Sequence, residues 1–230
     1  SSLVGSDMCI RDRIYIMNID HCNTHSSFID KVEMSNLCQE ITLPTKPIQH
    51  IDDDSGEIAL CILSAINIGK IRDVSDLKSL CDLSVRSLDE LIDFQGYPVE
   101  AAQIATKARR SLGIGYIGLA HYLAKQGVKY EDQKAWELVH DLTEAFQYHL
   151  IESTVNLAKE KGACEYSSRT KYGQGILPID TYKKDVDELV PNNLKYDWDS
   201  LRALVKEHGV RNSTLSAQMP SERSSVVSNA

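Results

Sequence analysis

The sequence contains no apolar run of the roughly 20 residues that a helix needs to cross a bilayer. Its first 13 residues also lack the order of charged, apolar and small residues that is typical of a signal peptide. No internal repeat or low-complexity segment is visible. These absences argue against a membrane-spanning, secreted or repeat protein. We therefore predict a soluble, cytoplasmic protein that has no membrane partner.

Positive charge is also scarce. The 230 residues include 25 Lys and Arg against 33 Asp and Glu, which gives a formal net charge of -8. A nucleic-acid backbone is bound by clustered basic side chains, so we predict no nucleic-acid partner. Small phosphate compounds stay open as ligands, because backbone N–H groups at a helix start bind them without net positive charge.

The cysteines form no C-x-x-C pair and no tight disulfide framework, although the chain has 6 of them. Such spacing favours reduced thiols in a cytosolic protein. Cys22 and His25 in "DHCNTH" are a candidate metal pair, but no second pair of ligands follows at zinc-finger spacing. We therefore predict no metal site, and we expect Cys81 and Cys164 to pack as small apolar groups.

Strand-like and helix-like stretches alternate along most of the chain, which indicates an α/β architecture. Residues 1–13 are unlike the rest, and we interpret them as an unrelated leader or junction. Strands are expected at 14–20, at 57–69, where a near-continuous apolar run predicts burial on both faces, and at 212–219. Helices are expected at 75–93 with Ser75 as its cap, 99–111, 116–126, 131–161 and 197–208, with glycines 127, 162 and 209 ending the last three.

Gly113, Gly115 and Gly118 form a literal G-x-G-x-x-G. A dinucleotide-binding fingerprint requires a strand directly before these glycines and an acidic residue about 20 positions later on the next strand. Here a predicted helix precedes the glycines, and another begins where the acidic residue should lie. Close helix packing or a tight turn explains these glycines better than dinucleotide binding.

The stretch "SNLCQEITLP" (35–44) places Asn36, Cys38 and Glu40 at every second position. Its β-branched residues and its closing proline favour a short strand or an extended loop. On such a backbone the side chains at i, i+2 and i+4 share one face. Alternating polar residues usually mark a solvated face, yet a thiol is unusual there. The pattern alone leaves both a solvated face and a reactive site open.

Two further stretches are candidate sites. Cys61 lies inside the apolar run, where a buried structural thiol is the default, although neighbouring strands could bring it near Cys38. "MPSERSS" (219–225) follows the last expected strand and suits a helix start. The N-terminus of a helix after a strand is a ready anion site, but every such helix also needs a cap.

Taken together, "SNLCQEITLPT", "GEIALCILSAINIG", "RRSLGIG" and "RNSTLSAQMPSE" resemble the alpha (large, catalytic) subunit of class I ribonucleoside-diphosphate reductase, in its aerobic bacterial form. The order and spacing of these stretches agree with that family over residues 14–230. The resemblance implies part of a ten-stranded α/β barrel that is incomplete in this chain. Residues 14–230 would then be a partial catalytic barrel domain, truncated at both ends.

The resemblance also implies roles for the candidate residues. Cys38 matches the cysteine that becomes a thiyl radical and takes the 3′ hydrogen of the ribose. Glu40 matches the base on the 3′ hydroxyl, and Asn36 matches the amide that hydrogen-bonds the substrate hydroxyls. Cys61 matches one member of a redox-active cysteine pair. The other member is expected outside this chain, because Cys9 lies in the foreign-looking leader.

The resemblance assigns the substrate diphosphate to the loop of Ser221, Glu222, Arg223 and Ser224. Most of this loop agrees with the family. Arg223 is a departure, because the family usually has a small hydroxyl residue at that position. A guanidinium there could clamp a phosphate or block the loop.

The implied function is the radical-based reduction of ribonucleoside diphosphates to 2′-deoxyribonucleoside diphosphates for DNA synthesis. The implied partners are the substrate, a metal-containing beta (small) subunit that supplies the radical, a second alpha subunit, and thioredoxin or glutaredoxin as reductant. No cofactor is expected to bind this chain directly, and the ATP and dNTP effectors are expected to bind outside it.

Two other functions stay open at this stage. One is a non-catalytic nucleotide-binding or scaffold fragment, because the radical relay and the second redox cysteine are not found in this sequence. The other is a cobalamin-dependent or glycyl-radical reductase, although Glu40 and Cys61 fit the glycyl-radical form poorly. We expect this chain alone to be inactive.

Overall fold

A computed structural model describes residues 16–230. The predicted leader over 1–13, including Cys9, lies outside the described residues, as does the predicted boundary at residue 14. Two parallel strands form the sheet, β1 (Ile62–Asn67) and β2 (Leu112–Ile117), and they pair in register from Ile62 opposite Leu112. Within 16–230 the sheet stays open, in agreement with the predicted incomplete barrel. The predicted α/β class is confirmed.

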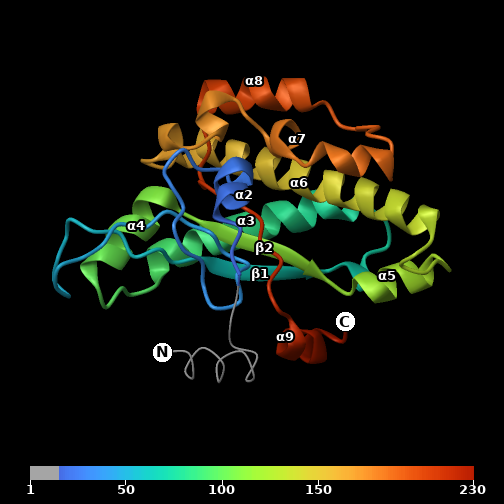
Figure 1. Ribbon diagram of the computed structural model, residues 1–230, viewed down its shortest axis with the longest axis horizontal. Coiled ribbons are helices and arrows are strands. Elements are labelled where there is room, and N and C mark those ends of the chain that lie inside the picture. Colours follow the sequence, from blue (N-terminus) through green and yellow to red (C-terminus); the bar gives the residue numbers. More distant parts are fainter. Residues whose placement is uncertain (1–15) are drawn as a thin grey trace.

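Helices lie mainly on one side of this sheet (Figure 1). The helix α3 packs against both strands, α6 packs on α3, and α8 packs on α6. The α-helices are α2 (Ile19–His25), α3 (Asp76–Phe94), α4 (Glu100–Arg109), α5 (Leu119–Lys125), α6 (Gln133–Lys161), α7 (Pro178–Thr181), α8 (Trp198–His208) and α9 (Glu222–Ser228). Short 3-10 turns are η1 (Ile68–Lys70), η2 (Ser167–Arg169), η3 (Tyr172–Gln174) and η4 (Lys184–Glu188).

The spacing of apolar residues explains why α3 forms and which face it buries. Its buried positions Leu77, Cys81, Val85, Leu88 and Ile92 follow one another at three- and four-residue steps, so they line one face of the helix. This face joins the main core between the sheet and α6. The predicted helices are confirmed at α3, α4, α5, α6 and α8, most of them slightly shorter than expected.

Cys81 and Cys164 are buried, as predicted. Ser75 occupies the N-cap position of α3, but its side chain makes no capping hydrogen bond. Its backbone N–H instead donates to Asp73 Oδ1 at 2.8 Å. The predicted position of the helix start is therefore right, whereas the predicted capping hydrogen bond of Ser75 is wrong.

Three strand predictions need correction. The described part of 14–20 forms no strand, and α2 begins at Ile19. β1 covers only the second half of the 57–69 run, and it is not buried on both faces, because Leu63 is 40% exposed. The strand β2 was missed, and the helix expected from 116 begins only at Leu119. Residues 212–219 contribute only an isolated bridge, between Ser216 and Ile114.

The glycines of the G-x-G-x-x-G motif serve close packing rather than dinucleotide binding. Gly113 and Gly115 lie within β2. A Cβ on Gly113 would collide with the side chains of Leu63 and Cys61, and a Cβ on Gly115 would collide with Ala217 and Gln218. A Cβ on Gly115 would lie 2.4 Å from the carbonyl oxygen of Ala217. Gly118 precedes α5 with φ +81°, a left-handed conformation that favours glycine. The close packing predicted for these glycines is confirmed, but the partner is an extended segment rather than a helix.

A second, smaller core lies apart from the main one. Phe28, Val32 and Leu43 are buried there, and Ile41 and Cys61 pack against them half-buried. This core anchors both flanks of the 35–44 stretch, because Val32 precedes the stretch and Leu43 lies near its end. Within residues 16–230, no helix combines the length and apolarity that a bilayer crossing requires.

Candidate active site

The 35–44 stretch forms a tight turn rather than the predicted strand or extended loop. The Asn36 Oδ1 accepts a hydrogen bond from the Ile41 N–H at 3.1 Å, and the Asn36 N–H donates to the Ile41 carbonyl at 3.3 Å. Gln39 completes the turn with φ +62°. The prediction was wrong because it did not consider that the Asn36 amide closes a local ring of hydrogen bonds, as asparagine side chains commonly do in turns.

Cys38 lies at the exposed tip of this turn, between Asn36 and Glu40. An exposed thiol is accessible to a reactant, whereas a buried structural cysteine is not. Glu40 is half-buried, and its Oε2 is enclosed without a hydrogen-bond partner within residues 16–230. Such a carboxylate oxygen is costly to bury unless a further group binds it.

Glu40 and Cys61 act on each other electrostatically. Burial of the Cys61 thiol, together with the nearby negative charge of Glu40, raises the pKa of Cys61 to about 12. Cys61 is therefore a neutral thiol at physiological pH and carries a hydrogen atom to donate. Its Sγ lies 4.0 Å from the Ile62 carbonyl oxygen, a weak contact at most.

One cavity connects the two candidate segments. Asn36 and Cys61 both line an opening of about 760 Å³, along with apolar side chains such as Ile41 and Leu43. The structure thus brings Asn36, Glu40 and Cys61 to one region, with Cys38 on the turn that carries the first two. The shared cavity and the effect of the Glu40 charge on Cys61 support the predicted proximity of the 36–40 motif to Cys61.

The segment that leads to the predicted phosphate loop passes beside Cys61. A Cβ on Gly113 would lie 2.8 Å from the Cys61 Sγ and 3.1 Å from the Ala217 Cβ, so both side chains converge on β2 at this glycine. The Ile114 N–H donates to the Leu215 carbonyl at 2.8 Å, and the Ala217 N–H donates back to Ile114 at 3.2 Å. These bonds fix the path of residues 215–217 beside β2, just before Pro220.

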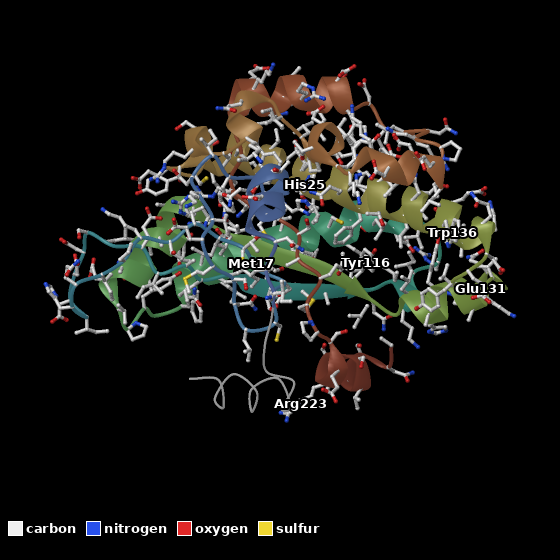
Figure 2. All side chains as sticks on the ribbon, in the orientation of Figure 1. Met17, His25, Tyr116, Glu131, Trp136 and Arg223 are labelled. Atoms are coloured by element: carbon white, nitrogen blue, oxygen red, sulfur yellow. The ribbon has the colours of Figure 1, made fainter. Side chains whose placement is uncertain are left out.

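The helix start predicted at "PSERSS" is confirmed as α9. Ser221 is its N-cap residue, and its carbonyl accepts the Ser225 N–H at 2.7 Å. Glu222, Arg223 and Ser224 are exposed. Figure 2 shows Arg223 at the lower edge of the molecule, below β2 and its residue Tyr116.

The contacts of α9 tie it to β1. The Asn67 side-chain amide donates to the Ser228 carbonyl at 3.1 Å. Within residues 16–230, no hydrogen bond links α9 to the turn around Cys38. The structure therefore brings the 36–40 turn and Cys61 together, but it does not join α9 to them directly.

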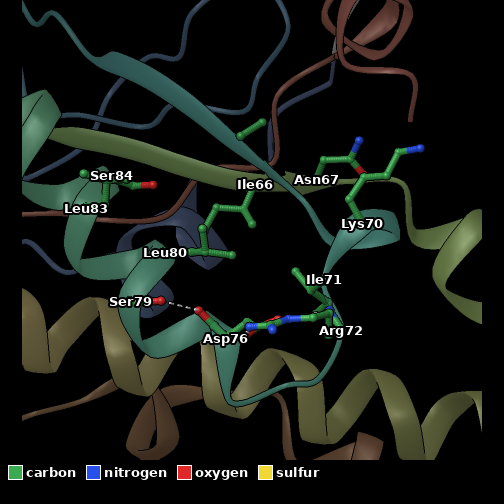
Figure 3. Close-up of a pocket in the computed structure, with 11 residues that line it drawn as sticks. Ile66, Asn67, Lys70, Ile71, Arg72, Asp76, Ser79, Leu80, Leu83 and Ser84 are labelled. Atoms are coloured by element: carbon green, nitrogen blue, oxygen red, sulfur yellow. Dashed lines mark hydrogen bonds and ion pairs between the residues drawn. The ribbon is translucent and has the colours of Figure 1, made fainter.

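Another cavity, between the end of β1 and α3, contains none of the predicted site residues (Figure 3). Arg72 and Asp76 form an ion pair there at 3.0 Å. Cys22 and His25 both lie on α2, where the His25 ring contacts the Thr181 carbonyl. Over the described range, no group of three or more His, Cys, Asp or Glu side chains is arranged to hold a metal ion.

Sequence reasoning missed the charged side chains at the base of the 36–40 turn. Glu57 and Arg109 are buried and bonded to each other, although 52 positions separate them in the chain. The only signal was the unusual Arg109–Arg110 pair before a strand, and it does not reveal the partner of either guanidinium.

Comparison with known proteins gives a consistent picture. Residues 11–230 match the family described as "Ribonucleotide reductase, barrel domain". The chain is 59% identical to the ribonucleoside-diphosphate reductase subunit alpha of Haemophilus influenzae, across 100% of this chain and 31% of that protein. It is 53% identical to the ribonucleoside-diphosphate reductase 1 subunit alpha of Escherichia coli, across 100% of this chain and 30% of that protein. The chain thus spans about a third of the length of these curated relatives.

Proposed function

The chain belongs to the ribonucleotide reductase barrel-domain family, and from this premise we propose that it carries part of the active site that reduces ribonucleoside diphosphates to 2′-deoxyribonucleoside diphosphates. One observation supports this proposal above the others. An exposed thiol, Cys38, lies on a turn between Asn36 and Glu40, and Glu40 lies close enough to Cys61 to raise the pKa of that second thiol.

Cys38 begins the proposed reaction. The partner subunit removes a hydrogen atom from its thiol, and the resulting thiyl radical takes the hydrogen atom from C3′ of the ribose. One S–H bond forms while one C–H bond breaks, and the two bonds are close in strength, so the transfer is nearly reversible. The exposed tip of the turn lets a substrate reach the sulfur.

Glu40 and Asn36 then act on the ribose hydroxyls. The carboxylate of Glu40 takes the proton of the 3′ hydroxyl, and a thiol of the redox pair that includes Cys61 gives a proton to the 2′ hydroxyl, which leaves as water. This is general acid–base work by positioned groups. The enclosed Oε2 of Glu40 has an open hydrogen-bonding position for such a proton. Asn36 supplies its amide N–H groups to the hydroxyls, because its carbonyl oxygen already accepts from Ile41.

Cys61 supplies the reduction. With a second cysteine, proposed to lie outside this chain, it gives two electrons and two protons and becomes a disulfide. The overall change is one ribonucleotide and two thiols to one deoxyribonucleotide, one disulfide and one water. Cys38 returns its hydrogen atom to C3′ and is again a radical. Disulfide exchange with thioredoxin or glutaredoxin then restores the two thiols.

The remaining components follow from the same family premise. Ser221, Glu222, Arg223 and Ser224, at the start of α9, are proposed to hold the substrate diphosphate. A metal-containing beta subunit supplies the radical, a second alpha subunit completes the assembly, and ATP or dNTP effectors bind elsewhere. We also propose that residues 14–230 are the catalytic barrel portion and that the protein acts in the cytoplasm.

Two cysteine variants in the assembled reductase test this proposal. Cys38→Ser removes the radical carrier, so deoxynucleotide formation should stop while the ribonucleoside diphosphate still binds. Cys61→Ser removes the reductant, so multiple turnover with a dithiol should stop. Buried Cys81→Ser, remote from the turn, is the matched control and should stay active. Appreciable product from the Cys38→Ser enzyme would refute the assignment.

A further inference from the structure

The turn that carries Cys38 belongs to a longer loop, residues 31–45, which is closed at its base by ionic contacts. Asp30 stands at the start of this loop. At its end, Lys46 pairs with Glu57 through two backbone hydrogen bonds, Lys46 N–H to Glu57 O at 3.0 Å and Glu57 N–H to Lys46 O at 2.9 Å. The side chains of Asp30 and Glu57 therefore mark the two ends of the loop.

A single guanidinium joins these two carboxylates. Arg109, the last residue of α4, donates from Nη1 to Asp30 Oδ2 at 2.9 Å and from Nε to Glu57 Oε2 at 2.8 Å. Its side chain is 3% exposed, so solvent screens these contacts little. The planar fork of arginine suits such a bridge between two carboxylates, and the single ammonium of lysine suits it less well.

A second arginine supports the same carboxylates. Arg169 Nε forms an ion pair with Asp30 Oδ2 at 2.9 Å, and its Nη2 lies 3.8 Å from Glu57 Oε1. Both guanidiniums also lie against the ring of Tyr166, with Arg169 at 4.1 Å and Arg109 at 5.0 Å from the ring centroid. These contacts limit the positions that each guanidinium can adopt.

The backbone beneath this cluster is fixed as well. The Ser213 N–H donates to the Arg109 carbonyl at 3.0 Å, and the Ile29 N–H donates to the Arg169 carbonyl at 3.1 Å. Asn23 holds the start of the loop, since its Oδ1 accepts the Val32 N–H at 2.8 Å. We call the contacts of Arg109 and Arg169 with Asp30 and Glu57 the clamp. The clamp connects the 31–45 loop to α4, to η2 and, through Ser213, to the segment that runs beside β2.

We propose that Arg109 is a positioning residue: by bridging Asp30 and Glu57 it fixes both ends of the 31–45 loop, and it thereby sets where Cys38 stands in the active site. Arg169 has a supporting role in the same clamp. The inference rests on the proposed function, because that function gives Cys38 its catalytic role. The effect of Arg109 on the position of the 31–45 loop can nevertheless be measured without enzyme turnover. A displacement of about 1 Å at a reacting group can cost on the order of 100-fold in rate.

The neighbouring residue provides a matched control. Arg110 is also buried and paired with two carboxylates, Asp89 at 2.6 Å and Asp93 at 2.8 Å. Both of these partners lie on α3, away from the loop. Replacing either arginine by glutamine removes one charged partner from a buried carboxylate, Glu57 or Asp89, so both changes should lower stability. Only the Arg109 change should release the loop that carries Cys38.

The test compares Arg109→Gln with Arg110→Gln in the assembled reductase. For Arg109→Gln we expect kcat to fall about tenfold or more while KM stays within about threefold, because positioning of the reacting group is lost rather than substrate affinity. Arg109→Lys keeps one charge and should recover part of kcat. For Arg110→Gln we expect kcat within about twofold of the parent enzyme, per folded molecule.

Alkylation of Cys38 by iodoacetamide, followed by mass spectrometry of its peptide, separates this inference from the proposed function. Arg109→Gln should change the Cys38 alkylation rate several-fold, and Arg110→Gln should not. An unchanged rate in Arg109→Gln, or an equal change in Arg110→Gln, overturns the clamp even if the parent proves inactive as a reductase. If Arg109→Gln does not fold, Asp30→Asn at the half-buried end of the bridge is used with the same expectations.

Discussion

At the scale of single residues, Cys38 and Cys61 carry the same functional group in opposite surroundings. Cys38 is exposed at the tip of a turn, whereas Cys61 packs against the small core beneath that turn. Burial disfavours the thiolate of Cys61, and the negative charge of Glu40 disfavours it further. The candidate site thus contains an accessible thiol and a protected one, as the different steps of the proposed reaction require.

The alkylation rate of Cys61 should follow its raised pKa. Since only the thiolate reacts, and the pKa has moved from 9.0 to about 12, the rate should still rise steeply with pH beyond pH 9. Glu40→Gln removes a negative charge and should move this profile to lower pH. The measurement is iodoacetamide modification of the Cys61 peptide between about pH 7 and pH 10.5, a range chosen around the ordinary thiol pKa. A rate that is half-maximal near pH 9.0 and levels off by about pH 10.5 would contradict the burial of this thiol.

The same shift has a consequence for stability. Because the folded pKa lies above the unfolded one, the unfolded state loses the Cys61 proton first as pH rises. The stabilising contribution is complete below pH 9.0, and it is lost as pH rises toward about 12. Alkaline pH should therefore weaken this part of the fold before it affects carboxylate-based contacts.

At the scale of elements, the helices with clear apolar spacing were predictable and the strands were not. The stripe of α3 and the glycines after α6 and α8 locate these helices from local pattern alone. β2 was missed because Gly113 and Gly115 have no side chain to show alternation. The lack of a Cβ matters against Leu63 and Cys61 at Gly113 and against Ala217 and Gln218 at Gly115, and all of these residues lie far away along the chain.

The candidate site was predictable to a similar degree. The 36–40 motif and Cys61 were identified from sequence, but the backbone at Asn36 was predicted as extended and is a turn. The clamp at Arg109 could not be predicted, because its partners lie 52 and 79 positions away and only the tertiary fold brings them together. Reactive residues that lie close together in the sequence can be recognised from the sequence, whereas ion pairs between distant residues become visible only in the folded structure.

The two helix starts at α3 and α8 provide a controlled test of capping. Asp197 caps α8, where its Oδ1 accepts the Ser200 N–H at 3.0 Å, whereas Ser75 makes no such bond at α3. Asp197→Ala should lower the melting temperature by about 2–4 °C, a typical cost for a lost cap in a protein of this size. Ser75→Ala should leave it nearly unchanged. Circular dichroism measures the melting temperature of each variant. Equal shifts in the two variants would show that loss of the capping hydrogen bond does not cause the lower melting temperature.

At the scale of the whole molecule, the sheet is small and open for a chain of 230 residues. Across the described chain, β1 pairs only with β2, so its other edge presents unpaired backbone groups. Leu63 of this strand is 40% exposed, Leu60 just before the strand is 38% exposed, and Val226 and Val227 of α9 are more than 80% exposed. Exposed strand edges next to apolar side chains are templates for association.

We therefore expect this 230-residue chain, produced by itself, to self-associate as its concentration rises. Leu63→Glu places a charge on β1, an edge strand of the sheet. It should weaken association, because a charged side chain on an edge strand opposes pairing with another strand. Leu189→Glu is the matched control, since Leu189 is 57% exposed at the end of η4 and lines a cavity with residues of α6 and α7 rather than of β1. Sedimentation velocity over a concentration series measures the effect. If Leu189→Glu weakened association as much as Leu63→Glu, the contact would lie on the helical layer, and the open sheet would not be its cause.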